Sequence, residues 1–367
     1  MSRRACELAL AAALVAGCGP APVAVDVCAA DAALAAALVG GQLHVEVRAA
    51  DGTPRAAGSA AVDHASRLAL GRASDGEWIV VEADDAGAQP VAVGAAQLQG
   101  NAACVCLSRS RWYAFATWQD KSGVYHDGRP TEFFVRRSRA PGVEPVRPLA
   151  LDRARVQPGD VLRATTAYQS DAGAAVDVRA IEVLARPPGA THGSGLAGGF
   201  SAITVGTVAP GAVVNVDATR RFAASDASGD WALFTRLTDR LGLVHDGPET
   251  GFTVGGSDSD PLIATAPPGL DHAWVRPPDM LHVTTSYRNP TAAPLTIQTL
   301  VETVRPPGGS NVGGPFDDLS PRLAVTTIGP GQTLDVAADR SFPAAEDPCA
   351  GMVCAVAGGL CQLRISP

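Results

Sequence analysis

The sequence predicts an all-β protein built from tandem antiparallel β-sandwiches. In short runs such as 161–168 and 176–184, alternate residues form two distinct sets, one for each face of a strand. This period of two is typical of strands with one buried face. Many of the 39 Gly and 28 Pro stand at the ends of such runs, where turns are expected. A long internal repeat is the third observation, and it predicts that the sandwiches occur in tandem.

The repeat has a period of about 119 residues, as from Trp112 to Trp231, which is the size of a small domain. A motif with Trp, Phe, Asp, Gly and His-Asp-Gly in the same order occurs at 112–135 and 231–254. Its most distinctive residues are Trp112, His126 and Asp127 in one copy and Trp231, His245 and Asp246 in the other. A Thr-Thr-x-Tyr strand and a later Pro-Gly turn also recur. An array of similar modules speaks against a single catalytic centre.

The N-terminus predicts export and lipid attachment. A basic start, an apolar run over 8–16 and small residues before Cys18 resemble a bacterial lipoprotein signal, in which the cysteine is lipidated. The apolar run is too short to cross a bilayer. We therefore expect a signal peptide with a lipobox over 1–18 and a tether over 19–40; an ordinary signal peptide with a coincidental cysteine is the alternative. By analogy with known lipoproteins, Gly19 favours the outer membrane or cell surface.

The composition narrows the classes of partner. With 29 basic and 37 acidic residues, the net charge of −8 argues against binding to nucleic acid or to an anionic membrane surface. Export permits disulfides among the six cysteines that follow Cys18, but the sequence does not choose their pairing. Cys104-Val105-Cys106 lacks the spacing of a zinc site.

The segment 145–256 contains a complete module. Its Pro-Gly-Asp-x-Leu turn, Thr-rich strand, Pro-Gly before a Val-rich strand and final Gly-x-Trp-x-x-Phe-x-x-x-x-Asp-x-x-Gly resemble the immunoglobulin-like or fibronectin-III-like modules of bacterial surface proteins. Such modules are often appended to secreted polysaccharide-degrading enzymes. The resemblance implies a fold and carries no catalytic residues to this chain.

The flanking modules look incomplete. The third, 262–346, lacks the closing hairpin and is followed by an atypical Cys-containing tail, 347–367. The first, 41–138, matches the scheme well only in its closing hairpin. For the tail, a change of reading frame near Asp347 is favoured over a small disulfide-tied substitute. For 41–103, a frame change and a divergent domain both stay open.

The recurring His-Asp pairs are the candidates for chemistry. A His-Asp pair can orient an imidazole for base catalysis, but neither copy has a nucleophile at a repeated spacing. We interpret His-Asp-Gly as a turn or bulge in which Asp caps the backbone and Gly takes a positive φ. Two ligands are too few for a metal site. We therefore expect no catalytic residue, no metal and no cofactor.

Other polar and aromatic residues are weaker candidates. Glu182 and Glu302 are expected to face solvent and to pair with arginine across a sheet. Trp112 and Trp231 are expected in the cores. The candidates for ligand binding are Trp118 and Trp274 for a glycan, and Asp317 and Asp318 for Ca²⁺.

The sequence thus predicts a non-enzymatic lipoprotein of the cell envelope that acts as a structural, adhesive or spacer module. The expected partners are the membrane, through the lipid on Cys18, and a glycan or another envelope protein. The alternative function is that of a carbohydrate-binding accessory protein in a polysaccharide-degrading system.

Overall fold

The computed structural model describes residues 24–30, 32–62, 74–87, 90–99, 102–108, 111–136, 139–200, 203–256, 262–306, 317–318, 323–346, 349, 352–354 and 361–363. These residues form several mostly antiparallel sheets, which confirms the all-β prediction. The helix α1 (Ala32–Ala37) has six residues. In the described part of the chain no helix has the length and apolar character needed to cross a membrane.

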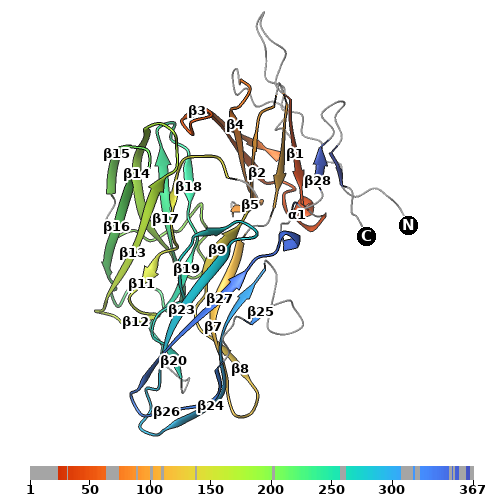
Figure 1. Ribbon diagram of the computed structural model, residues 1–367. Helices are drawn as coiled ribbons and strands as arrows, with labels where there is room; N and C mark the ends of the chain where they lie inside the picture. The colour runs from red at the N-terminus through yellow and green to blue at the C-terminus, as the bar shows by residue number, and fades with distance from the viewer. Residues whose placement is uncertain are drawn as a thin grey trace, which may run out of the picture.

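The N-terminal domain is a four-stranded antiparallel sheet of order β3-β2-β4-β5, accompanied by a parallel pair of β1 and β6 (Figure 1). Its strands are β1 (Ala24–Ala29), β2 (Gln42–Arg48), β3 (Pro54–Ala61), β4 (Trp78–Asp84), β5 (Pro90–Gln97) and β6 (Ala102–Leu107). Alternate residues of β2 and β4, such as Val45, Val47 and Val81, bury one face of the sheet in the domain core. The opposite face is left available to the neighbouring module.

The middle module is a two-layered sandwich. Its strands are β10 (Val143–Pro145), β11 (Ala150–Leu151), β12 (Arg155–Val156), β13 (Val161–Ser170), β14 (Val176–Arg186), β15 (Ile203–Val208), β16 (Val213–Arg221), β17 (Gly229–Asp239), β18 (Val244–Asp246) and β19 (Thr250–Val254). One layer contains β10, β11, β13 and β16, and the other contains β15-β14-β17-β19 with β12 and β18. Leu162, Tyr168 and Phe222 from the first layer meet Trp231 and Phe252 from the second. The period-two pattern read in 161–168 and 176–184 reflects this two-layered burial.

The third module is assembled from two separate parts of the chain. The C-terminal part supplies β20 (Ile263–Ala264), β21 (Gly269–Leu270), β22 (Trp274–Val275), β23 (Met280–Arg288), β24 (Leu295–Arg305), β25 (Asp317–Asp318), β26 (Leu323–Ile328) and β27 (Thr333–Ser341). The earlier part supplies β7 (Arg111–Gln119), β8 (Tyr125–Asp127) and β9 (Thr131–Val135). β7 pairs antiparallel with β24, and β9 pairs in parallel with β22. In Figure 1 the gold β7 and β8 lie beside the blue β24.

The same aromatic cluster closes both sandwiches. Trp112 meets Phe342 edge to face, with ring centroids 5.4 Å apart and an interplanar angle of 81°. Trp231 meets Phe222 in the same way, at 5.6 Å and 81°. Phe133 and Phe252 complete the two clusters. The early hairpin therefore occupies, in the third module, the position that 229–254 occupies in the middle module.

This arrangement differs from the expectation that 41–138 forms one module and that 262–346 lacks its closing hairpin. Trp112, Phe133 and Val135 are at most 9% exposed, and residues of the C-terminal part cover them. Without the hairpin, β24 would present an unpaired edge and the core would stay open. The hairpin of 111–135 therefore completes the sandwich to which 262–346 supplies the other strands.

The two sandwiches are joined edge to edge through β9 and β19. Thr131 and Thr250 lie opposite each other, so that a single sheet runs through both modules. The contacts repeat about a pseudo-twofold axis. On either side of this pair, Glu132 N donates to Glu249 O and Gly251 N donates to Pro130 O, both at 2.7 Å. The junction is therefore hydrogen-bonded on both sides.

A disulfide ties the N-terminal domain to the segment that follows the third module. Cys106 at the end of β6 is bonded to Cys349, which follows β27 and the short 3₁₀ helix η2 (Ala344–Glu346). Cys28 and Cys104 are also disulfide-bonded. The tail contains a small antiparallel pair, β28 (Met352–Cys354) and β29 (Cys361–Leu363). The expected signal peptide and Cys18 lie outside the described residues.

Candidate functional site

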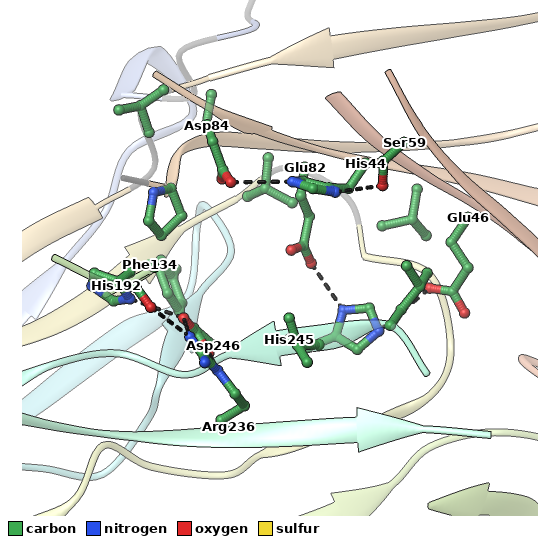
Figure 2. Close-up of a pocket in the computed structure, with 18 of the residues that line it drawn as sticks. His44, Glu46, Ser59, Glu82, Asp84, Phe134, His192, Arg236, His245 and Asp246 are labelled. Carbon is green, nitrogen blue, oxygen red and sulfur yellow. Dashed lines mark hydrogen bonds and ion pairs between the residues drawn. The ribbon is translucent and has the colours of Figure 1, made fainter. Parts of the chain in front are cut away.

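A cavity of about 400 Å³ lies where the N-terminal domain meets the middle module. Its walls come from β2, β4 and β5 on one side, from the β17–β18 hairpin on the other, and from the end of β9. Figure 2 shows that histidine and carboxylate side chains from both domains point toward one another across it. The cavity therefore brings together titratable groups that are far apart in the sequence.

His44 is held on the N-terminal wall between two neighbours. Its Nδ1 lies 2.7 Å from Ser59 Oγ, and its Nε2 lies 3.1 Å from Asp84 Oδ2 (Figure 2). The hydrogen bond to Asp84 raises the pKa of His44 against the opposing effect of burial. Ser59, His44 and Asp84 lie on the adjacent strands β3, β2 and β4, and the pairing of these strands brings the three side chains into a row.

His245 lies between carboxylates of both domains. Its Nδ1 is 3.1 Å from Glu82 Oε1, while its Nε2 is 3.8 Å from both Glu46 Oε2 and Asp239 Oδ2. Burial opposes the charge on this imidazole, but the Glu82 carboxylate and its neighbours outweigh burial and raise the pKa of His245 to about 10. At neutral pH His245 is thus a cation.

His192 anchors the middle-module side of the cavity. Its two ring nitrogens lie 2.9 Å from Asp246 Oδ2 and 2.8 Å from Glu249 Oε1. Arg236 donates two hydrogen bonds to Asp246, at 2.7 and 2.8 Å, and Arg186 donates two to Glu249. Burial penalises the Asp246 carboxylate, but hydrogen bonds from Arg236 and His192 dominate and lower its pKa. This network is internally neutralised and leaves little charge for a ligand.

The repeated motif builds the β17–β18 hairpin that carries His245. Asp239 Oδ1 accepts hydrogen bonds from Leu241 N at 2.8 Å and Leu243 N at 2.9 Å, and Gly242 has a φ of 86°. The Asp-x-x-Gly part of the motif is therefore the turn. The hairpin then pairs His245 with Leu237 across the strands.

His-Asp-Gly lies at a bulge, as one of the two interpretations had it: three residues between Asp246 and Thr250 lie opposite two residues of β17. The positive φ expected of its glycine is wrong. Asp246 and Asp127 bind cross-strand partners: Asp246 binds Arg236, and Asp127 accepts hydrogen bonds at 2.9 Å from Thr117 and from Arg305. Gly247 is required for close approach, because a Cβ there would lie 2.5 Å from Thr235 Oγ1. Cross-strand contact, and not turn chemistry, places these residues.

The second copy of the motif has a different environment. His126 Nε2 lies 3.2 Å from Asp120 Oδ2, and the ring stacks on Trp118 at a centroid distance of 4.1 Å. Two of the carboxylates that approach His245, Glu46 and Glu82, belong to the N-terminal domain. One motif therefore serves two different environments.

The structure places the other predicted residues as follows. Trp118 is 4% exposed, so its ring does not offer a platform to a glycan. Trp274 lies beneath the guanidinium of Arg139, at 4.4 Å. Asp317 and Asp318 form β25 against β24, and their side chains lie outside the described part. Trp112 and Trp231 are in the cores, as expected. None of these six residues is among the described residues that line the cavity.

Glu302 is buried, contrary to the expectation that it faces solvent. β24 matches β14 at an offset of 119, so Glu302 is equivalent to Val183, not to Glu182. A shift of one residue moves a side chain to the other face of a strand. Glu302 therefore points into the third core, where Tyr287 donates to its Oε1 at 3.4 Å. Glu182 lies opposite Arg236 in the sheet.

Sequence reasoning did not identify His44, Glu46, Glu82 or His192 as site residues. They lie outside the repeated motif, and the first three belong to the segment where the repeat is weakest. The alternation of His44 with Glu46 and of Glu82 with Asp84 is a usable signal, since residues two apart on a strand share a face. The sequence does not show which module this face packs against, because that depends on how the domains dock.

Comparisons with known proteins do not identify a family. No family model matches the chain, and no curated protein matches it. Among solved structures, the sporulation control protein Spo0M of Bacillus subtilis has a TM-score of 0.24 and 12% identity, over 51% of this chain and 91% of that one. Salmonella alpha-2-macroglobulin reacted with methylamine has 0.19 and 11%, over 83% and 26%. A tetra-tandem repeat from the extending region of a large adhesion protein has 0.17 and 11%, over 83% and 84%. These weak likenesses are to β-rich proteins and carry no functional argument.

Proposed function

We propose that this chain is a non-enzymatic structural spacer of the cell envelope, in which a disulfide shields two joined sandwiches from a stretching force. The observation that carries the proposal is the position of the Cys106–Cys349 disulfide. The two cysteines are 243 residues apart, immediately outside the first and last strands of the joined sandwiches. The bond therefore encloses both sandwiches in one covalent loop.

The loop changes the path of a stretching force. A force that enters through a lipid on Cys18 and leaves through the tail passes along the N-terminal domain, across the disulfide and into the tail. The two sandwiches lie outside this path, so their hydrogen bonds bear none of the load. A spacer that keeps its length under tension requires this property.

The joined sheet supports the same function. Beyond the Thr131–Thr250 pair, Glu132 N donates to Glu249 O and Gly251 N donates to Pro130 O, both at 2.7 Å. Ala154 N and Ala273 N donate across the junction to Thr265 O and Val146 O, at 2.9 and 2.8 Å. Backbone contacts of this kind do not depend on flexible side chains, and they oppose rotation of one sandwich against the other.

Single-molecule pulling between the N-terminal segment and the tail tests the proposal. With the disulfide intact, residues 107–348 should release no contour length. In a Cys106→Ser variant the same stretch should release roughly 80 nm on unfolding, at about 3.3–3.6 Å per residue. Release of that length from the intact, oxidised wild type would contradict the proposal. Loss of membrane fractionation in Cys18→Ala would separately support the lipid anchor.

A second candidate function rests on the row Ser59–His44–Asp84. These are the residue types of a hydrolase triad, with contacts of 2.7 and 3.1 Å. Ser59 is, however, exposed on a regular strand and not at the strained turn that presents a nucleophilic serine in many hydrolases. Covalent labelling of Ser59 by a fluorophosphonate, lost in Ser59→Ala, would favour hydrolysis over a purely structural function.

A further inference from the structure

Three ligand-type side chains converge at the boundary between the N-terminal domain and the middle module. Glu46 comes from β2, Asp239 from the end of β17 and His245 from β18, and one donor atom of each lies within 4.8 Å of the other two. We propose that Glu46, Asp239 and His245 bind a divalent transition-metal ion, with Zn²⁺ as the best-fitting ion. The proposal does not depend on the spacer function.

The distances match a site that contracts slightly around an ion. His245 Nε2 lies 3.8 Å from an oxygen of each carboxylate. Zinc bonds of about 2.0–2.2 Å place two ligands of a tetrahedral site about 3.3–3.6 Å apart. Each ligand therefore has to move by only a few tenths of an ångström. A direct hydrogen bond would need a much closer approach than 3.8 Å.

The donor atoms are buried and have no hydrogen-bond partner. These atoms are Asp239 Oδ2, His245 Nε2 and, on Glu46, the oxygen Oε1, which is not the oxygen that lies 3.8 Å from His245. Glu46 and Asp239 are only 2% and 3% exposed. A buried polar atom without a hydrogen bond lowers the stability of the fold, and three such atoms belong to this one cluster. A cation among them would satisfy all three.

The remaining polar atoms of the three ligands are held by other groups. Glu82 lies 3.1 Å from His245 Nδ1, which is the carboxylate–histidine arrangement that orients a metal-binding imidazole. Arg48 donates to Glu46 Oε2 at 2.9 Å, and the β17–β18 turn donates to Asp239 Oδ1. Asp239 and His245 thus each have one held polar atom and one free atom, whereas the Glu46 oxygen nearest His245, Oε2, is the one that Arg48 holds and Oε1 is free.

The second copy of the motif provides an internal comparison. There His126 Nε2 lies 3.2 Å from Asp120 Oδ2, against 3.8 Å for the equivalent pair in the middle module. The wider separation occurs where Glu46 supplies a third donor. The motif by itself therefore makes a histidine–aspartate contact, and the N-terminal domain converts one copy into a three-ligand site.

The donor set selects the class of ion. Two carboxylate oxygens and one imidazole nitrogen suit a divalent transition metal better than Ca²⁺, which takes only oxygen ligands, and there is no thiolate to select Cu(I). Three protein ligands are one fewer than a closed structural zinc site uses. A fourth position is left for water or for a small anion from the cavity. The ion replaces the proton on His245 Nε2 and links the two domains.

Isothermal titration of the full-length oxidised chain with ZnCl2 tests the proposal. One equivalent should bind, and Glu46→Gln, Asp239→Asn and His245→Gln should each weaken binding by more than the roughly 10–100-fold that loss of an outer partner causes. Glu82→Gln should fall within that range. His126→Gln is the matched control and should bind as the wild type does. Unchanged affinity in the three ligand variants, or no binding at millimolar Zn²⁺, would overturn the proposal.

A spectroscopic measurement keeps the test independent of variant folding. Zinc-edge X-ray absorption of the wild type loaded with one equivalent should show nitrogen and oxygen ligands with imidazole scattering. A sulfur shell would assign the ion to cysteines and overturn the proposal. Neither measurement applies a force, so a failure of the metal-site proposal would leave the spacer proposal standing. A failure of the pulling experiment would likewise leave the metal site standing.

Discussion

Replacement of Glu302 by glutamine should stabilise the third module at neutral and alkaline pH. Glu302 is 0% exposed, and burial raises its pKa from 4.5 to about 8, with only weak opposition from hydrogen bonds to Thr285 and Tyr287. The folded protein therefore keeps Glu302 protonated at a pH where the unfolded chain has released that proton. Glutamine has nearly the same shape and carries no charge at any pH.

The sign and size of the effect follow from this difference in pKa. Because the folded state binds the proton more tightly, the contribution of Glu302 is greatest below about pH 4.5 and is lost as the pH rises toward about 8. The two pKa values correspond to a loss of roughly 5 kcal/mol over that interval, as an upper estimate. Most of this loss should be present by pH 7.

Urea unfolding of the wild type and of Glu302→Gln between pH 5 and 9 measures the difference. The wild type should lose stability relative to the variant as the pH rises, and the two curves should diverge by several kcal/mol. Glu182→Gln is the matched control, since Glu182 is half-buried opposite Arg236, and it should leave the pH dependence nearly unchanged. Parallel curves for wild type and Glu302→Gln would refute this explanation.

Two further substitutions test the packing. Trp112→Ala should destabilise the third module by about 3–5 kcal/mol in thermal unfolding, because its indole fills the core against Phe342 and Phe133; a change confined to the N-terminal domain would contradict this. Gly247→Ala should cost about 1–3 kcal/mol, since the new Cβ would lie 2.5 Å from Thr235 Oγ1, whereas Gly128→Ala, with its nearest neighbour at 3.3 Å, should cost less; equal losses would argue against the close approach.

The strand content was predictable from local patterns. Alternation over 161–168 and 176–184 identified β13 and β14, because each strand has one face in a core. The repeat also identified the shared hairpin motif and its core tryptophans. These features depend on residues close together in the sequence, where a period of two or a turn motif is visible.

The assembly of the third module was not predictable in the same way. The repeat showed that 112–135 and 262–346 are complementary halves. The hairpin was nevertheless assigned to 41–138, because it lies next to that segment in the sequence. The middle module is inserted between the two halves, and only tertiary pairing of β7 with β24 reunites them. Glu302 illustrates a finer difficulty: it lies 120 residues after Glu182, whereas their strands are 119 residues apart, so the two side chains lie on opposite faces.

The cavity depended on the docking of one domain against another. His245 was visible from the sequence, whereas Glu46 and Glu82 acquire meaning only when β2 and β4 face the β17–β18 hairpin. Two ligands in one motif are too few for a metal, and the third comes from a segment that shows little of the repeat. Interfaces of this kind leave no periodic signal in the sequence.

Nuclear Overhauser contacts of the Trp112 indole test most directly whether the early hairpin closes the third module. The Trp112 and Phe342 rings are 5.4 Å apart between centroids, and Leu281 and Val283 lie in the same core. Contacts from the indole to Phe342 and to these aliphatic side chains are expected. Contacts to Val45 or Val81 of the N-terminal sheet instead would show that 41–138 folds as one module, and would contradict the closed pair of sandwiches.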